Sequence, residues 1–165
     1  MSSDEVLTVA QLLAQVEEAT AVVTAVIEGC SEERWETAVA EEGRTVGVVL
    51  HHIAYAYPFV VDWACKLAQG EGAPAVSYDD IHAINHQHAE AQADVDPAAT
   101  LTLLKRNAQA AQAQIGQLSD ADLQVSAPFA LIGGQEISVQ QMVQWFLVNH
   151  AHNHLTAIHN TIGGK

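Results

Sequence analysis

The chain is poor in basic residues, cysteine, proline and aromatic residues. Its six Lys plus Arg face 20 Asp plus Glu, which leaves a formal net charge of −14 at pH 7. A phosphate backbone and an anionic bilayer surface would both be repelled by this charge. We therefore expect neither nucleic acid nor a membrane among its partners.

Cysteine and long apolar runs are also scarce. Cys30 and Cys65 are the two cysteines, and no CxxC pair occurs, which excludes a disulfide framework. No apolar stretch approaches the roughly 20 residues that a transmembrane helix needs. The first residues, Met1 to Glu5, are acidic where a signal peptide would be basic. We expect a cytoplasmic protein that forms one domain over residues 1–165.

The residues that are present favour an all-α fold. Apolar residues make up 49% of the chain, alanine and glutamine are abundant, and runs of β-branched residues are short. Apolar residues recur at helical spacing in four regions. These run from about Thr8 to Ile27, from Thr45 to the loop at Gly70, from Tyr78 or Asp79 to Leu118, and from Ser138 to about Ile162.

Capping residues and prolines refine these helices. Thr45 and Ser138 are candidate N-caps. Pro58 lies inside the second helix and removes its hydrogen bond to Ala54. Pro97 either splits the third region or begins a new helix. Residues 119–137 hold Pro128 and a Gly-Gly pair, which predicts a loop with a short extended piece at most. The sequence thus predicts a four-helix bundle with one long connection before the last helix.

Two histidines near the C-terminus are the most informative residues. His150 and His154 are four residues apart and continue the apolar stripe of the last helix, so they should share one buried face. Two neutral imidazoles buried together need partners for both acceptors, and one divalent metal ion satisfies them at once. His152 and His159 lie on another face and are expected at the surface or at the rim of the site.

A third ligand is expected from the pair His51-His52. His52 is in helical phase with Val49 and Phe59, whereas His51 follows a more polar line, so His52 is the better inward candidate. Three histidines from two helices would leave one coordination position open, as catalytic metals require.

A rival cluster holds His82, His86 and His88. His82 and His86 are also four residues apart, but their surroundings are polar, which favours a solvated helix start. The alternative is that this cluster forms the rim of the same cavity, where one histidine could carry protons.

The order and spacing of these histidines resemble the DinB-like (DinB/YfiT-like) superfamily of metalloenzymes. An early family motif places the first ligand after a short apolar run, as in Arg44 to Ala54, and a late His-x-x-x-His motif matches His150 and His154. Tryptophan often stands where this chain has Arg44, and Gly-Gln where it has Thr156-Ala157. The resemblance implies an up-down-down-up bundle, frequent homodimers, and nickel or zinc bound by His52, His150 and His154.

The leading functional hypothesis is a metal-dependent enzyme that acts on a small molecule. The open site suits hydrolysis or S-transfer, and the resemblance implies that a low-molecular-weight thiol could serve as cosubstrate. The sequence contains no distinct motif for binding a thiol, so Arg44 and Arg106 are candidates for binding an anionic thiol only because basic residues are few. One alternative is a non-enzymatic metal-binding stress or sensor protein, and another is a helical interaction protein whose histidines only pack. Metal identity and the roles of the remaining histidines stay open.

Overall fold

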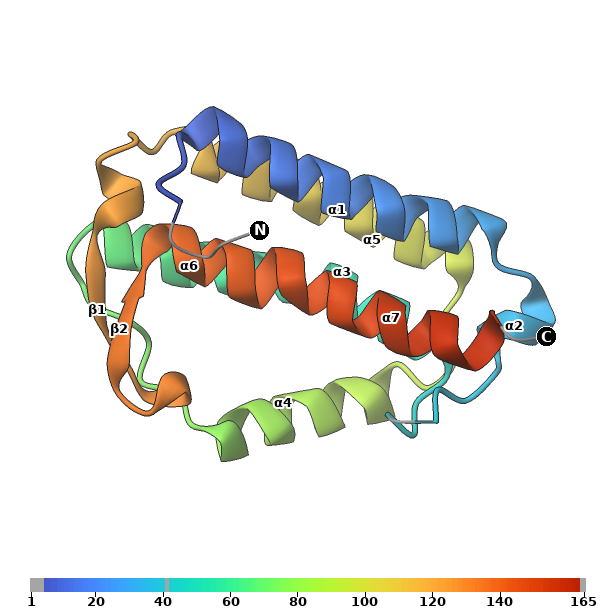
Figure 1. Ribbon diagram of the computed structural model, residues 1–165. Helices are drawn as coiled ribbons and strands as arrows, with labels where there is room; N and C mark the ends of the chain where they lie inside the picture. Colours follow the sequence, from blue (N-terminus) through green and yellow to red (C-terminus); the bar gives the residue numbers. More distant parts are fainter. Residues whose placement is uncertain (1–4, 41, 164–165) are drawn as a thin grey trace.

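The computed structural model describes residues 5–40 and 42–163. The first four residues, which contribute to the signal-peptide expectation, lie outside this range. The described chain is mainly helical and carries one small hairpin (Figure 1). The helices are α1 (Val9–Gly29), α2 (Glu32–Trp35), α3 (Val46–Ala68), α4 (Tyr78–Ala91), α5 (Pro97–Ile115), α6 (Val139–Val143) and α7 (His150–Ile162). The hairpin pairs β1 (Ser126–Phe129) with β2 (Gln135–Ser138) in antiparallel register, from Ser126 opposite Ser138 to Phe129 opposite Gln135.

The long helices form the predicted four-helix bundle. In Figure 1, α1 and the last helix run in one direction while α3 and α5 run in the other, which is the up-down-down-up order. α3 and α5 can be parallel because α4 carries the chain back along the bundle between them. The all-α prediction is therefore confirmed, and the hairpin is a minor addition within the connection before α6.

Local capping explains where the helices begin. The Thr45 hydroxyl accepts a hydrogen bond from the Val48 amide at 3.3 Å, and Ser138 caps α6 in the same way. Asp96 caps α5, and Pro97 is its first residue. The third predicted region is therefore two helices. Proline is well accepted as the first residue of α5, because an amide hydrogen at that position would have no acceptor within the helix.

α3 continues through Pro58 because another helix supplies the missing donor. Proline has no amide hydrogen, so the carbonyl of Ala54 loses its usual partner. The side-chain amide of Asn107, on α5, donates to this carbonyl at 2.9 Å. The bond fixes α3 against α5 close to the turn that carries His52.

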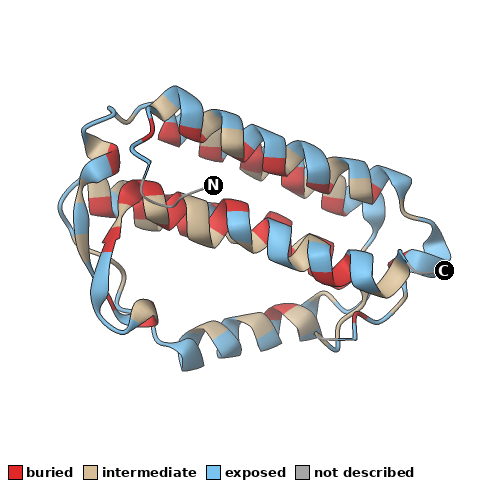
Figure 2. Ribbon diagram, viewed as in Figure 1, coloured by how far each residue is buried: buried red, intermediate tan, exposed pale blue. Residues whose placement is uncertain are grey.

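The buried residues lie mainly on the parts of the helices that are turned toward the interior of the bundle, which are coloured red in Figure 2. α1 buries Leu12, Val16, Ala19, Val23 and Ile27 there. By length and composition alone α1 could cross a membrane, which corrects the expectation that no segment qualifies, although its apolar stripe packs in this core. α4 differs from the other long helices because His88 is its one buried residue.

Candidate metal centre

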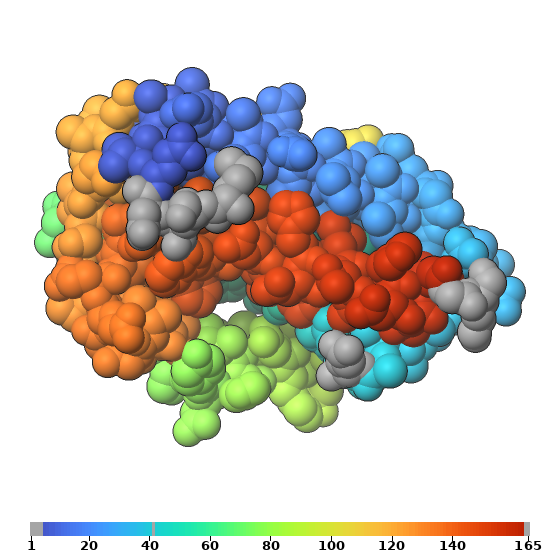
Figure 3. Space-filling model, in the orientation of Figure 1, coloured from blue at the N-terminus to red at the C-terminus, as the bar shows by residue number. Residues whose placement is uncertain are grey.

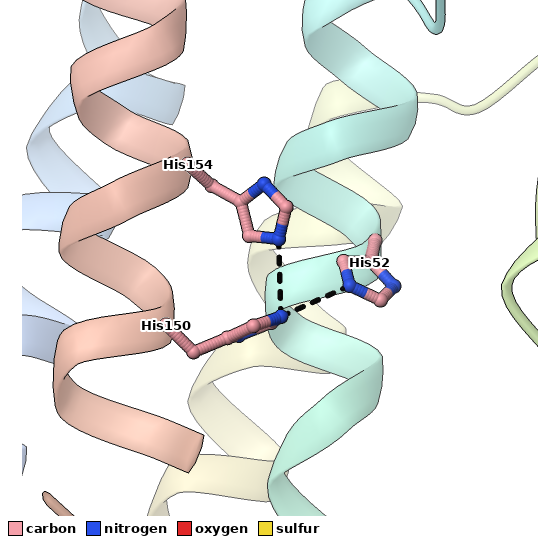
Figure 4. A group of neighbouring side chains, drawn as sticks. All are labelled: His52, His150 and His154. Atoms are coloured by element: carbon pink, nitrogen blue, oxygen red, sulfur yellow. Dashed lines mark hydrogen bonds between the residues drawn. The ribbon is translucent and has the colours of Figure 1, made fainter. Parts of the chain in front are cut away.

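The imidazoles of His52, His150 and His154 meet between α3 and α7 (Figure 4). Nε2 of His150 lies 3.1 Å from Nε2 of His52 and 3.0 Å from Nε2 of His154. One nitrogen of each ring lies within 4.8 Å of those of the other two. Among the described residues this is the one group of three or more His, Cys, Asp or Glu side chains with such spacing.

The last helix is not α-helical throughout, contrary to the prediction. A π-helical segment, Gln144–Asn149, separates α6 from α7 and ends directly before His150. Such segments are rare and are frequent at functional sites. The chain stays helical over the predicted range, and His150 and His154 remain on one face of α7 because both lie beyond the π-helical segment.

Burial keeps two of these imidazoles neutral. Together with the neighbouring histidines and Arg44, burial lowers the pKa of His52 to about 2 and that of His150 to about 3, although Glu42 acts in the opposite direction on His150. Neutral imidazoles carry a nitrogen lone pair that can bind a metal ion. Nδ1 of His52 is buried and has no hydrogen-bond partner among the described side chains.

The donor set fits a divalent cation. An N–H···N hydrogen bond pairs two ring nitrogens, so it cannot satisfy three that converge on one point. Tetrahedral zinc with Zn–N bonds of 2.0–2.1 Å places its nitrogen ligands about 3.3 Å apart. The observed 3.0 and 3.1 Å separations are close to this spacing.

A carboxylate from a loop orients one of the imidazoles. Nδ1 of His154 lies 2.5 Å from Oε1 of Glu42, and Oε2 of Glu42 accepts a hydrogen bond from Arg44. Burial alone would raise the pKa of Glu42, but His154 and Arg44 outweigh it and hold this pKa below its usual value. The ionised carboxylate keeps the proton of His154 on Nδ1, which leaves Nε2 free to coordinate a metal.

Sequence reasoning missed Glu42 as a functional residue. It lies in the loop between α2 and α3, in an acidic stretch without periodicity, so no local pattern distinguishes it from its neighbours. Arg44 was a candidate for thiol binding, but the structure engages it with Glu42.

The remaining histidines separate by burial. His82, His86, His152 and His159 are exposed, as predicted, and His86 lies 3.3 Å from Glu90.

His88 is the exception in its cluster, since it is buried. Its Nε2 lies 2.8 Å from Nδ1 of His51, and its ring packs edge-on to His52 with centroids 5.6 Å apart. Burial lowers the pKa of His88 to about 4. The sequence spacing contains a signal for the burial of His88. His88 follows Ile81 by seven residues and Ile84 by four, so all three lie on one face of α4, which is turned toward α3.

A cavity of about 300 Å³ leads to the three imidazoles. It lies between α3, α4 and the last helix, and Figure 3 shows a hollow between α4 and that helix. Its walls are mainly apolar. They are formed by His52, Tyr55, Ala56, Phe59, Val60, Trp63, Tyr78, Ile81, Ile84, Asn85, Leu131, Phe146, His150 and His154.

Solved structures of low sequence identity share this fold. YfiT from Bacillus subtilis, described as a probable metal-dependent hydrolase with an unusual four-helix bundle topology, matches with a TM-score of 0.73 and 18% identity. The match covers 98% of this chain and 87% of YfiT. A mycothiol-dependent maleylpyruvate isomerase matches with a TM-score of 0.73 and 14% identity, over 96% of this chain and 63% of the isomerase.

A third similar structure bears on the nucleic-acid expectation. The colibactin self-resistance protein ClbS, in complex with double-stranded DNA, matches with a TM-score of 0.69 and 13% identity, over 93% of this chain and 94% of ClbS. The expectation that this chain binds no nucleic acid therefore stays a prediction. No curated protein sequence matches the chain.

The sequence profile of the DinB superfamily matches residues 15–158, which include all three histidines of the candidate centre. This range covers most of the bundle, from the second turn of α1 to the third turn of α7. The chain belongs to the DinB superfamily.

Proposed function

We propose that the protein is a metal-dependent enzyme in which His52, His150 and His154 bind one divalent cation, nickel or zinc. Its reaction would be transfer of a low-molecular-weight thiol to a small electrophile, in which the new S–C bond replaces the bond to a leaving group, or hydrolysis of a small molecule. The observation that carries the proposal is the position of the three Nε2 atoms at the wall of a cavity of about 300 Å³. A structural metal site is closed by its four protein ligands, whereas a catalytic site keeps one position for water or substrate.

A cation at this position would lower the pKa of a bound water to about 7 or hold a thiol as the nucleophilic thiolate. The protein's part is to supply neutral imidazoles and to hold them in place. Glu42 orients His154, and Arg44 in turn holds Glu42. The part of the chain that the structure describes places no carboxylate in the cavity wall. Either nucleophile would therefore be activated by the metal rather than by a carboxylate base.

Two of the similar structures support a metal-dependent site and the use of a thiol. YfiT is described as a probable metal-dependent hydrolase, and the isomerase depends on the thiol mycothiol. Neither Arg44 nor Arg106 is among the residues that line the cavity, so neither is retained as a thiol-binding residue. Cytoplasmic location and assembly into a homodimer are part of this proposal by resemblance to the family.

Elemental analysis of the purified protein tests the proposal. We expect one equivalent of nickel or zinc per chain, and we expect His52→Ala, His150→Ala and His154→Ala each to lose it. His152→Ala is the matched control, because His152 is an exposed histidine on the same helix as His150 and should retain the metal. Full metal content in His154→Ala, or none in the unmodified protein, would refute the proposal.

The competing function is that of a non-enzymatic metal-binding stress or sensor protein. The two differ in whether the bound metal accepts an outside ligand. Cobalt-loaded protein should change its visible absorption when azide or a thiol is added, if the fourth position is open to the cavity. An unchanged spectrum at saturating ligand would favour the non-enzymatic function.

A further inference from the structure

The cavity beside the candidate metal centre is apolar over most of its wall. Apart from the three histidines, its polar side chains are Tyr55, Tyr78 and Asn85. Among the described residues that line it, none carries a formal charge at pH 7 when the histidines are neutral. Aromatic side chains are concentrated here, since Phe59, Trp63 and Phe146 join the two tyrosines.

The mouth of the cavity exposes apolar surface to solvent. Phe59, Tyr78 and Ile84 are 39%, 64% and 37% exposed. They are three of the five large apolar residues that are exposed in the described chain, and all three line this one cavity. Scattered apolar residues on a surface need no explanation, but a group around a concave site is typical of a ligand-binding surface.

The charged pair beside the metal centre does not line the cavity. Arg44 binds Glu42 through Nη2, and Glu42 in turn contacts His154, while Nη1 of Arg44 is buried without a hydrogen-bond partner among the described residues. The protein as a whole carries a net charge of −14. A second negative charge on a ligand, beyond the group that binds the metal, would therefore lose water without gaining a cationic partner, which is costly.

The volume limits the size of the ligand. An engineered protein cavity of about 150 Å³ binds benzene. The present cavity of about 300 Å³ can therefore hold one aromatic ring together with a short substituent that reaches the histidines.

We propose that the site takes an uncharged, single-ring aromatic or comparably sized apolar molecule with one metal-binding head group, and that it discriminates against anionic ligands. This inference rests on the proposed function for the role of the head group. The apolar wall would bind the body of the molecule, and the metal would bind a thiol, alcohol or similar group at its end. Phe59, on α3, and Tyr78 and Ile84, on α4, would cover the part of the ligand that lies at the mouth of the cavity.

A pair of thiols that differ in one charge tests the proposal on cobalt-loaded protein. 4-Methylbenzyl mercaptan and 4-(mercaptomethyl)benzoate share the ring and the thiol, and the second replaces the methyl group by a carboxylate. We expect the uncharged thiol to bind at least tenfold more tightly, followed through the thiolate-to-cobalt absorption band. Equal binding, or tighter binding of the carboxylate, would overturn the inference.

Variants at the mouth of the cavity locate the preference. Phe59→Ala should raise the Kd of the uncharged thiol several-fold. Val22→Ala, which shortens an exposed apolar residue outside the cavity, should leave this Kd unchanged. Ile84→Lys places a cation at the mouth of the cavity. It should therefore reduce the ratio between the Kd values of the charged and the uncharged thiol. If Phe59→Ala and Ile84→Lys both leave the Kd values of the two thiols unchanged, the inference is also contradicted.

Metal-free protein separates this inference from the proposed function. Fluorine NMR can compare 4-fluorobenzyl alcohol with 4-fluorobenzoate, neither of which needs a metal to enter the cavity. Failure to bind cobalt would refute the metal site, while preferential binding of the alcohol would still support the apolar ligand. Preferential binding of the benzoate would overturn it whatever the metal content.

Discussion

Nδ1 of His154 lies 2.5 Å from the carboxylate of Glu42, a residue 112 positions earlier in the chain. The contact joins the loop before α3 to the last helix, and it leaves Nε2 of His154 free to face Nε2 of His150 at 3.0 Å. A carboxylate behind a metal-binding histidine fixes the ring and increases its basicity. Glu42 is therefore a positioning residue for the proposed metal centre.

Replacing Glu42 by glutamine should weaken metal binding without abolishing it. The amide keeps the size of the side chain but removes the negative charge that favours the Nδ1 proton of His154. We expect the Kd for zinc to rise about tenfold or more, within the range known for such outer partners of metal ligands. A competition titration with a chromophoric chelator measures this. Glu36→Gln, an exposed carboxylate in the same connection, should leave the Kd unchanged, and an equal effect at both positions would contradict the role of Glu42.

The metal-free protein should lose stability as the pH falls below about 6.5. An unfolded histidine has a pKa of about 6.5, whereas His52, His150 and His88 in the folded protein have pKa values of about 2, about 3 and about 4. Between these values the unfolded chain binds more protons, so the free energy of unfolding decreases with falling pH. Each of the three histidines contributes a slope of up to about 1.4 kcal/mol per pH unit.

Urea unfolding of metal-free protein between pH 7.5 and 5 measures this slope. His52→Asn should show a shallower dependence because one of the three neutral imidazoles is gone. His152→Ala should retain the original slope, since His152 is exposed. Stability that is independent of pH over this interval would show that these three imidazoles titrate normally in the folded state.

Sequence periodicity predicted the helices but could not separate the core from the cavity. Ala56, Phe59 and Trp63 lie in helical phase with His52, as core residues would, yet the structure places all three on the cavity wall. Phe59 is 39% exposed for this reason. A ligand cavity with apolar walls has the same sequence pattern as a packed interior, because both require apolar residues on one helix face.

The roles of residues that contact distant parts of the chain could not be predicted from the sequence either. Local signals sufficed for Thr45 and Ser138, whose capping bonds reach neighbours within three residues, whereas for Pro97 they left two alternatives that the structure decided. Glu42 and Asn107 instead contact partners on other elements, so their roles follow from the three-dimensional arrangement. The proposed metal ligands were an intermediate case, because helical phase alone favoured His52 over His51 as the residue that faces the interior of the bundle.

The bond from Asn107 to Ala54 should matter only while Pro58 is present. In the unmodified protein, Asn107→Leu leaves the Ala54 carbonyl without its donor, which should cost about 1–3 kcal/mol. In a Pro58→Ala background the amide of residue 58 can donate to that carbonyl, as in a regular helix. The same Asn107→Leu change should then cost less, so the two substitutions should be coupled.

A double-mutant cycle measured by denaturant unfolding quantifies this coupling. The expected interaction energy is about 1 kcal/mol, in the direction that makes the double variant more stable than the sum of the single effects predicts. Strict additivity would mean that Asn107 stabilises the protein by packing rather than by replacing the donor that Pro58 lacks.

Gly47 is required by the close approach of Trp35 to α3. A Cβ at position 47 would lie 2.3 Å from Nε1 of Trp35, and this nitrogen donates to the carbonyl of Val95 at 2.8 Å. Gly47→Ala must therefore displace the indole and break its hydrogen bond. We expect a loss of about 1–3 kcal/mol in the free energy of unfolding, as for other overpacked sites. Differential scanning calorimetry would show the loss as a lower Tm.

Gly29→Ala provides the matched control, because a Cβ there meets no atom within 4 Å and alanine favours the helix. Its Tm should be unchanged or higher. The two variants should also differ in metal binding, since Trp35 and Glu42 lie in the same connection between α1 and α3. If moving Trp35 shifts this connection, Gly47→Ala should raise the Kd for zinc while Gly29→Ala does not. A lower Tm with unchanged zinc affinity would show instead that the loop around Glu42 is held by its own contacts to Arg44 and His154 and needs no support from the indole.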